Sequence, residues 1–271
     1  MSTTTPIATP LRIWFGVEVL FGILAVSAVG VRPSSTATNF AWTIKPVVMA
    51  ASLGAFYIAS APLFLLPMFA KRWEMVRVMT LPVALFSSIQ LLVTFLHWNK
   101  FHVHSGPFAV WLASYVLPPP MFVGAFLWNQ GRWTDDTSAY QPLGRALRAT
   151  LLGLGVGFSS IALLVLISPV AVTGRFAWKM SPLTARSLSG WLMVLGALQL
   201  SIVHENHRAR TRLASPFLIT AFLATVAQLL RYRDQVSWNN GLLWTGLAML
   251  AAACVCGVNL ARGSWKESMG E

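Results

Sequence analysis

The chain of 271 residues is both apolar and basic: 56% of its residues are hydrophobic, 10% are charged, and its formal net charge is +12. A soluble domain needs about a quarter of charged residues for its surface, so this composition excludes an ordinary soluble enzyme and indicates a membrane protein. The Lys and Arg residues stand between apolar stretches rather than along one polar segment, which favours contact with lipid headgroups over nucleic-acid binding.

Eight stretches of the sequence are apolar over the length of about 20 residues that a helix needs to cross a bilayer. The first lacks a cleavage site of small residues, so we interpret it as a membrane helix rather than a signal peptide. The second is long enough to tilt, or to kink at Pro62 and Pro67. In chain order the predicted spans are Leu11–Val31, Trp42–Ala70, Val76–Trp98, Phe108–Trp128, Ala146–Val172, Leu183–Val203, Leu213–Leu230 and Gly241–Leu260.

One phrase of the sequence occurs twice. Phe-Ala-Trp-x-x-x-Pro begins at Phe40 and again at Phe176, a shift of 136 residues (176 − 40), and the same shift pairs Gly54 with Gly190. Each half then holds four spans, and an even number inserts both halves with the same orientation. The sequence therefore predicts two parallel four-helix repeats related by an axis along the membrane normal.

The expected fold class is an all-α integral membrane protein of eight transmembrane helices. Twelve of the 20 Lys and Arg residues fall on the side of both termini, so the positive-inside rule places both termini in the cytoplasm. We expect a bacterial plasma membrane as the location. The predicted organisation is a cytoplasmic tail (1–10), the first repeat (11–128), a cytoplasmic connection (129–145), the second repeat (146–262) and a second cytoplasmic tail (263–271).

Two polar stripes follow helical faces in corresponding spans of the two halves. Lipid cannot satisfy a glutamine amide, so both stripes should face the interior of the bundle. They indicate either a polar cavity that opens outward or interhelical hydrogen bonds that contribute about 1 kcal/mol each. The stripes consist of Ser87, Gln90, Thr94 and His97 in the third span, and of Thr225, Gln228 and Arg231 in the seventh.

The outer ends of these spans carry a group of cations, and Asp234 is the single acidic residue on that side. Such a group suits an anionic headgroup, phosphate or carboxylate, although long cations near helix ends also reach the interface without any ligand. Lys45 and Arg231 are the strongest candidates for ligand contact. Trp42 and Trp178, in the repeated phrase, either stack on a substrate or belong to the aromatic belt at the membrane boundary.

Two features inside the spans also point to a site. Glu18 is the one carboxylate within a predicted span, where it must be paired or protonated, so it is a candidate for proton coupling or for a structural hydrogen bond. Pro118, Pro119 and Pro120 interrupt the fourth span and free the carbonyl groups four residues before them, those of Ser114, Tyr115 and Val116. Broken helices at mid-membrane often line a site, which makes Ser114 and Tyr115 candidate contacts.

The remaining histidines and the cysteines give no metal or cofactor signature. The pair His204 and His207 is one residue short of the His-Glu-x-x-His spacing, and neither it nor the pair His102 and His104 has further ligands nearby. We therefore predict no cofactor and no metal.

The sequence favours a protein that binds or transports a small anionic or amphipathic molecule, including a lipid-linked one, at an outward-facing polar site between the repeats. One alternative is a membrane enzyme that acts on a lipid headgroup with His97 as acid or base, which lacks a carboxylate partner on that side. The other is a non-catalytic accessory subunit whose polar stripes only hold the bundle together. Expected partners are the bilayer and an anionic lipid or small-molecule ligand. The predicted binding residues are Lys45, Gln90, Thr94, His97, Ser114, Tyr115, Gln228, Arg231, Trp42 and Trp178.

Overall fold

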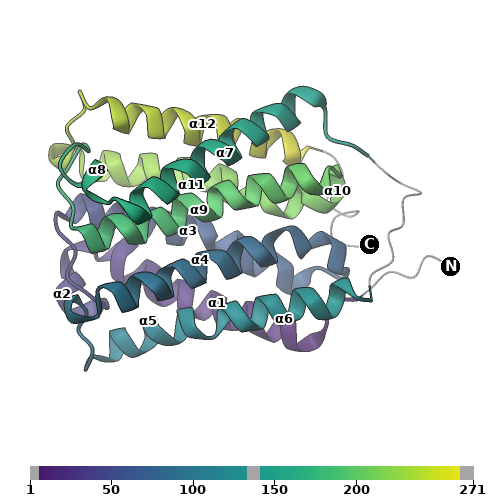
Figure 1. The fold of residues 1–271 in the computed structure, drawn as a ribbon, viewed down its shortest axis with the longest axis horizontal. Coiled ribbons are helices and arrows are strands. Elements are labelled where there is room, and N and C mark those ends of the chain that lie inside the picture. The colour runs from purple at the N-terminus through teal and green to yellow at the C-terminus, as the bar shows by residue number, and fades with distance from the viewer. Residues whose placement is uncertain (1–5, 133–140, 263–271) are drawn as a thin grey trace.

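The computed structural model describes residues 6–132 and 141–262, and within these ranges eight helical segments are long and apolar enough to cross a membrane. The predicted eight-span helical fold is confirmed. Residues 1–5 and 263–271 of the predicted tails, and residues 133–140 of the predicted connection, lie outside the described residues. The spans lie side by side in one bundle, with the short helices α2 and α8 at one end and α10 at the other (Figure 1). We refer to these as the outer and the inner end, following the orientation that the sequence predicts.

Three of the spans are built from more than one helical element, namely Thr9–Val31, Gly106–Gln130 and Arg208–Arg231. The first half consists of α1 (Thr9–Ala25) with a π-helical turn (Val26–Val31), α2 (Thr36–Asn39), α3 (Val47–Phe69), α4 (Arg77–Leu96), α5 (Gly106–Val116) and α6 (Pro118–Gln130). The second half consists of α7 (Arg145–Ile167), α8 (Val170–Thr173), α9 (Pro182–Glu205), α10 (Arg208–Thr211), α11 (Ser215–Arg231) and α12 (Gly241–Ala261).

The helix ends depart from the prediction at two places. Trp42 lies before α3 rather than inside it, because the chain between α2 and α3 is not helical. The fifth span ends at Ile167 rather than Val172, since Pro169 has no N–H with which to continue the helix. By contrast, α3 runs without interruption through Pro62 and Pro67.

Helices α3, α4, α9 and α11 form the interior of the bundle, and the other spans cover them. Across the two halves, α3 packs against α11 and α4 packs against α9. Helices α3 and α4 are the second and third spans of the first half, and α9 and α11 are the second and third spans of the second half. Exchanging the two halves therefore turns the pair of α3 and α11 into the pair of α9 and α4. The neighbours are therefore those that a parallel repeat predicts, while the duplication itself stays a prediction.

Glycine allows close approach of the first two spans in each half. A methyl group on Gly54 of α3 would overlap the backbone of Val29 and Gly30, and one on Gly196 of α9 would lie 2.7 Å from the backbone nitrogen of Ser159. Backbone atoms cannot move aside as a flexible side chain does. Small residues at these crossings are therefore required by the packing, as in many membrane helix pairs.

The two tryptophans of the repeated phrase are buried between the halves. Trp42 donates its indole N–H to Oγ1 of Thr184 at the start of α9 (3.3 Å), and Trp178 donates to Sδ of Met49 at the start of α3 (3.0 Å). The exposed fractions are 2% for Trp42 and 8% for Trp178, so neither ring lies in the lipid interface. Each half therefore holds the beginning of an interior helix of the other half.

At the inner end, three charged residues link the halves. Glu205 accepts hydrogen bonds from Nε of Arg77 (2.7 Å) and from Nη1 of Arg210 (3.3 Å), and 2% of its side chain is exposed. Arg77 also donates to Oε1 of Gln130 at the end of α6 (3.2 Å). This buried carboxylate therefore joins α4 and α6 of the first half to α9 and α10 of the second.

Candidate functional site

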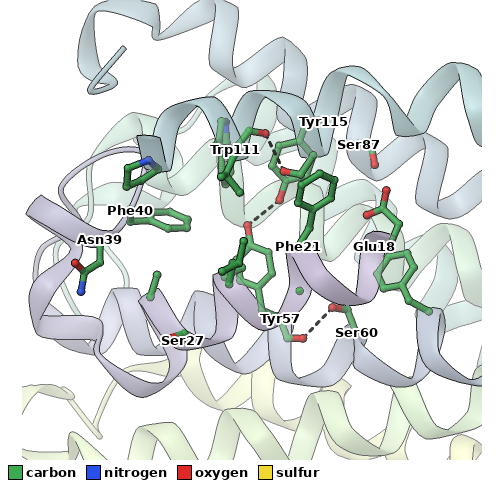
Figure 2. A pocket seen from close by; sticks show the side chains of 18 of the residues that line it. Glu18, Phe21, Ser27, Asn39, Phe40, Tyr57, Ser60, Ser87, Trp111 and Tyr115 are labelled. Atoms are coloured by element: carbon green, nitrogen blue, oxygen red, sulfur yellow. Dashed lines mark hydrogen bonds between the residues drawn. The ribbon is translucent and has the colours of Figure 1, made fainter. Parts of the chain in front are cut away.

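A cavity of about 390 Å³ lies among the four spans of the first half, with Trp191 of α9 in its far wall. Figure 2 shows its side chains, which come from α1, α3, α4 and α5 and from the chain near α2. This cavity therefore lies within the first half, whereas the sequence predicts a site between the halves. Its polar lining residues are Glu18, Ser27, Arg32, Thr38, Asn39, Tyr57, Ser60, Ser87, Ser114 and Tyr115.

Glu18 supplies the strongest unsatisfied polar group of this cavity. It is the tenth residue of the first span, which puts it about 14 Å from the inner end of that helix at 1.5 Å per residue, close to mid-membrane. Its exposed fraction is 7%, and its Oε1 atom has no hydrogen-bond partner among the described residues. Burial of a carboxyl oxygen without a donor is costly, so the site favours a proton or a donor from a ligand.

Two tyrosines provide a hydroxyl donor in the same cavity. The hydroxyl groups of Tyr57 and Tyr115 lie 2.7 Å apart and form one hydrogen bond (Figure 2). Each phenol carries one hydrogen, so a single bond between them leaves the second hydrogen for another acceptor. The hydroxyl group of Ser60 donates to the backbone carbonyl of Tyr57 (2.9 Å), and its oxygen can still accept a hydrogen bond.

Two irregularities in the flanking helices border the cavity. The fourth span breaks at Leu117, between α5 and α6, as the three consecutive prolines predict. Ser114 and Tyr115, just before the break, line the cavity. The π-helical turn that ends the first span contributes Ser27, and such turns often occur at functional sites.

Aromatic rings form the rest of the wall and hold it rigid. Trp111 contacts Tyr115 with ring centroids 4.4 Å apart and Phe40 with centroids 5.5 Å apart. On the far side, Phe86 and Trp191 lie 4.3 Å apart. Polar groups and aromatic rings therefore line the cavity together, a combination that suits an amphipathic ligand.

The residues of the predicted polar stripes are buried except for His97 and Arg231, but most of their polar atoms bond to protein. Gln90 donates to the carbonyl of Ser187 (2.9 Å) and accepts from its hydroxyl (3.0 Å), which joins α4 to α9. Thr94 donates to the carbonyl of Gln90 (2.8 Å) and accepts from the indole of Trp111 (2.9 Å). Gln228 donates to the carbonyl of Gly30 (3.1 Å). Of the third-span stripe, only Ser87 lines the cavity.

The predicted outer cations do not gather around the cavity. Arg231 donates to the carbonyl groups of Gly30 (2.9 Å) and Val31 (3.0 Å), where it caps the end of the first span. Lys45 is exposed beside a shallow hollow that it shares with Lys179. Among the described residues, Arg32, at the outer end of the cavity, is the one cation in its lining.

His97 lies just after the last residue of α4, outside the span. Its Nε2 atom is 2.9 Å from Nη1 of Arg186, and because a guanidinium group only donates, this nitrogen must be unprotonated. Arg186 also donates to the carbonyl of Leu166 (2.9 Å). His97 is therefore engaged in a link between α4, α7 and α9, which gives the enzyme alternative no free acid or base at this position.

We expect the His97–Arg186 link to weaken in acid. Burial, followed by the charges of Arg186 and Lys100, lowers the pKa of His97 from its ordinary value of 6.5. The neutral ring is therefore favoured in the folded state, and the resulting stability is present above pH 6.5 and lost as the pH falls toward the lowered pKa. His102, which shares the small outer hollow with His97, is the other titratable neighbour.

The measurement is the thermal midpoint of the solubilised protein between pH 7.5 and 5, for wild type and for His97→Gln, whose carbonyl oxygen can still accept from Arg186. The wild type should lose more of its midpoint than the variant over this range. Equal losses would show that His97 does not carry the pH dependence.

The sequence interpretation did not identify Tyr57 and Ser60 as site residues. Both are polar groups in the middle of an apolar span, and their spacing of three puts them on one helical face. The argument that lipid cannot satisfy Gln90 applies equally to a phenol, so this signal was present in the sequence.

Fold and cavity together define a multi-pass α-helical membrane protein with a chamber that is polar at mid-depth. Comparison of the chain with models of known protein families, with characterised proteins and with solved structures finds no match. Within residues 6–132 and 141–262, no three His, Cys, Asp or Glu side chains are grouped so that they could hold a metal ion.

Proposed function

We propose that this protein binds an amphipathic molecule whose head carries a hydroxyl or an amino group, with the head in the polar cavity. The observation that carries the proposal is the Oε1 atom of Glu18, which is buried in the cavity wall without a donor. A ligand that supplies this hydrogen removes the cost of the unpaired group.

The charges around the cavity favour this class of ligand over an anion. An ionised Glu18 would repel an anionic head; Arg32 belongs to the lining but lies at the outer end of the cavity, and Lys45 and Arg231 lie outside the lining. The remaining phenolic hydrogen of the Tyr57–Tyr115 pair can donate to a hydroxyl or carbonyl oxygen of the same head. The sequence left anionic and amphipathic ligands open, and the site chemistry supports the amphipathic class.

Glu18 also gives binding a route to proton coupling. A cationic amine that displaces a proton from this carboxyl group would link ligand movement to the proton gradient, which is one of the two roles that the sequence leaves open for this residue. The proposed function is therefore ligand binding, and Glu18 would also allow transport of the ligand coupled to the proton gradient.

We expect three ligands with the same dodecyl chain to differ in affinity. In nanodiscs, dodecylamine and dodecanol should raise the thermal midpoint of the wild type at lower concentration than dodecyl phosphate. Glu18→Gln should weaken dodecylamine by about tenfold or more, equivalent to 1.4 kcal/mol, because the amide has no charge to pair with the ammonium group.

Glu74→Gln is the matched control, since Glu74 and Glu18 are both 7% exposed and Glu74 does not line the cavity. This variant should keep the ligand order of the wild type whatever its stability. The proposal fails if dodecyl phosphate binds as tightly as dodecylamine, or if Glu18→Gln leaves the amine affinity unchanged.

A further inference from the structure

A second cavity, of about 750 Å³, lies among the four spans of the second half. Its wall is almost wholly apolar, with Phe158 and Leu164 of α7, Leu192 of α9, and Leu247 and Leu250 of α12. One hydroxyl in this wall, that of Thr225, has no partner among the described residues. Asn240 and Arg175 line its outer end.

The two cavities occupy corresponding places in the two halves. Several wall residues of one lie 136 positions after wall residues of the other, namely Phe40 and Phe176, Asn39 and Arg175, Val110 and Gly246, Trp111 and Leu247, and Ser114 and Leu250. Three polar residues of the first cavity correspond to apolar residues 136 positions later in the sequence. Glu18 corresponds to Leu154, Tyr57 to Met193 and Tyr115 to Ala251. The second cavity is therefore both wider and less polar.

An apolar chamber of this size at membrane depth requires an apolar occupant. Water would form too few hydrogen bonds with such a wall to be stable there. If the cavity were empty, the residues that line it would lack dispersion contacts on one side. The surrounding bilayer supplies hydrocarbon chains directly. A lipid chain can enter the chamber without first passing through water.

Charge complementarity identifies the class of lipid. Arg175 is exposed at the outer end of the cavity, and its carbonyl oxygen accepts from the side chain of Asn240 (2.7 Å). Trp244, in the first turn of α12, is 53% exposed and marks the level of the membrane boundary, where lipid phosphates lie. A guanidinium group at this level binds a phosphate well.

We propose that the second cavity holds one acyl chain of a phospholipid from the outer leaflet, with the lipid phosphate against Arg175. This site is independent of the polar cavity and of its ligand. Chain and phosphate are recognised by different residues, so they can be tested separately.

The test uses the full chain in phosphatidylcholine vesicles that contain a phosphatidylglycerol with a photoactivatable diazirine in one acyl chain. After illumination, mass spectrometry locates the labelled residues. In the wild type we expect label on the cavity wall, at residues such as Leu247 and Leu250. Label confined to lipid-exposed positions such as Val255 would overturn the proposal.

Gly246→Phe tests the chamber directly. A Cβ atom added at Gly246, in the cavity wall, meets no atom within 4 Å, so a phenylalanine can be placed there without a backbone clash at its Cβ. Gly153→Phe is the matched control, because Gly153 also has open space around it but is exposed on α7 and outside the cavity wall. Gly246→Phe should reduce label on the wall severalfold, and Gly153→Phe should not. Equal label in the two variants would overturn the proposal.

Arg175→Gln tests the phosphate contact. It should lower the label from phosphatidylglycerol toward the level given by a diacylglycerol with the same photoactivatable chain, which has no phosphate. Equal labelling of the wild type by the two probes would refute the role of Arg175. A cross-link between two copies of the protein at the cavity opening would show that a second copy, not a lipid, covers it, and would also overturn the proposal.

Discussion

Replacement of Glu205 by glutamine is expected to lower the free energy of unfolding by about 3–5 kcal/mol. The guanidinium groups of Arg77 and Arg210 converge on this carboxylate, and only 2% of its side chain is exposed. Without its charge, two cations lie close together in a site that excludes water. Because Arg77 belongs to the first half and Glu205 to the second, the variant should also loosen the inner contact between the halves.

The effect can be measured by reversible unfolding in mixed micelles with increasing dodecyl sulfate. Asp234→Asn is the matched control, since it makes the same change in an ion pair with Arg233 that is almost fully exposed. Exposed pairs contribute little, so this control should stay close to the wild type. Similar small losses in both variants would contradict a structural role for Glu205.

Gly54→Ala is expected to lower the free energy of unfolding by about 3 kcal/mol, the upper end of the range for overpacking. The added methyl group would overlap backbone atoms of Val29 and Gly30, so α1 and α3 would have to move apart. The π-helical turn that borders the polar cavity lies at this contact. The variant should therefore also weaken the binding of a dodecylamine ligand.

Gly153→Ala provides a control with the opposite expected sign. A methyl group at this exposed position of α7 meets nothing within 4 Å, and alanine favours a helix over glycine by up to about 1 kcal/mol. This variant should be as stable as the wild type or slightly more stable. Equal free energies of unfolding for Gly54→Ala and Gly153→Ala would contradict the close backbone contact between the first span and α3.

The spans of this protein can be predicted from the sequence because the requirement is local. A bilayer imposes a minimum length of apolar residues, and each of the eight predicted spans overlaps a helical span of the structure. The break at Leu117 was equally predictable, since three consecutive prolines remove hydrogen bonds whatever surrounds them. The fifth span ends at Ile167, before the predicted Val172, because Pro169 interrupts the helix although the apolar stretch continues.

The site was only partly predictable, because partners on other helices decide which polar groups stay available. Glu18, Ser114 and Tyr115 were candidates from the sequence, and all three line the polar cavity. Gln90 was an equally good candidate, but Ser187 of α9 satisfies both ends of its amide. Ser187 reaches Gln90 because α9 is turned about its own axis so that this residue faces α4. No local sequence pattern predicts how the two helices are turned relative to each other.

Two copies of a single four-span chain, related by a two-fold axis, would exchange tryptophans between protomers as Trp42 and Trp178 are exchanged between the halves here. In a two-fold dimer every contact occurs twice, so a mutation that changed one chamber would change both. Joining the copies in one gene removes that constraint, because the codon for Glu18 and the codon for Leu154 can then evolve separately. After such a fusion, one cavity could change to bind a polar headgroup while the other changed to bind a hydrocarbon chain.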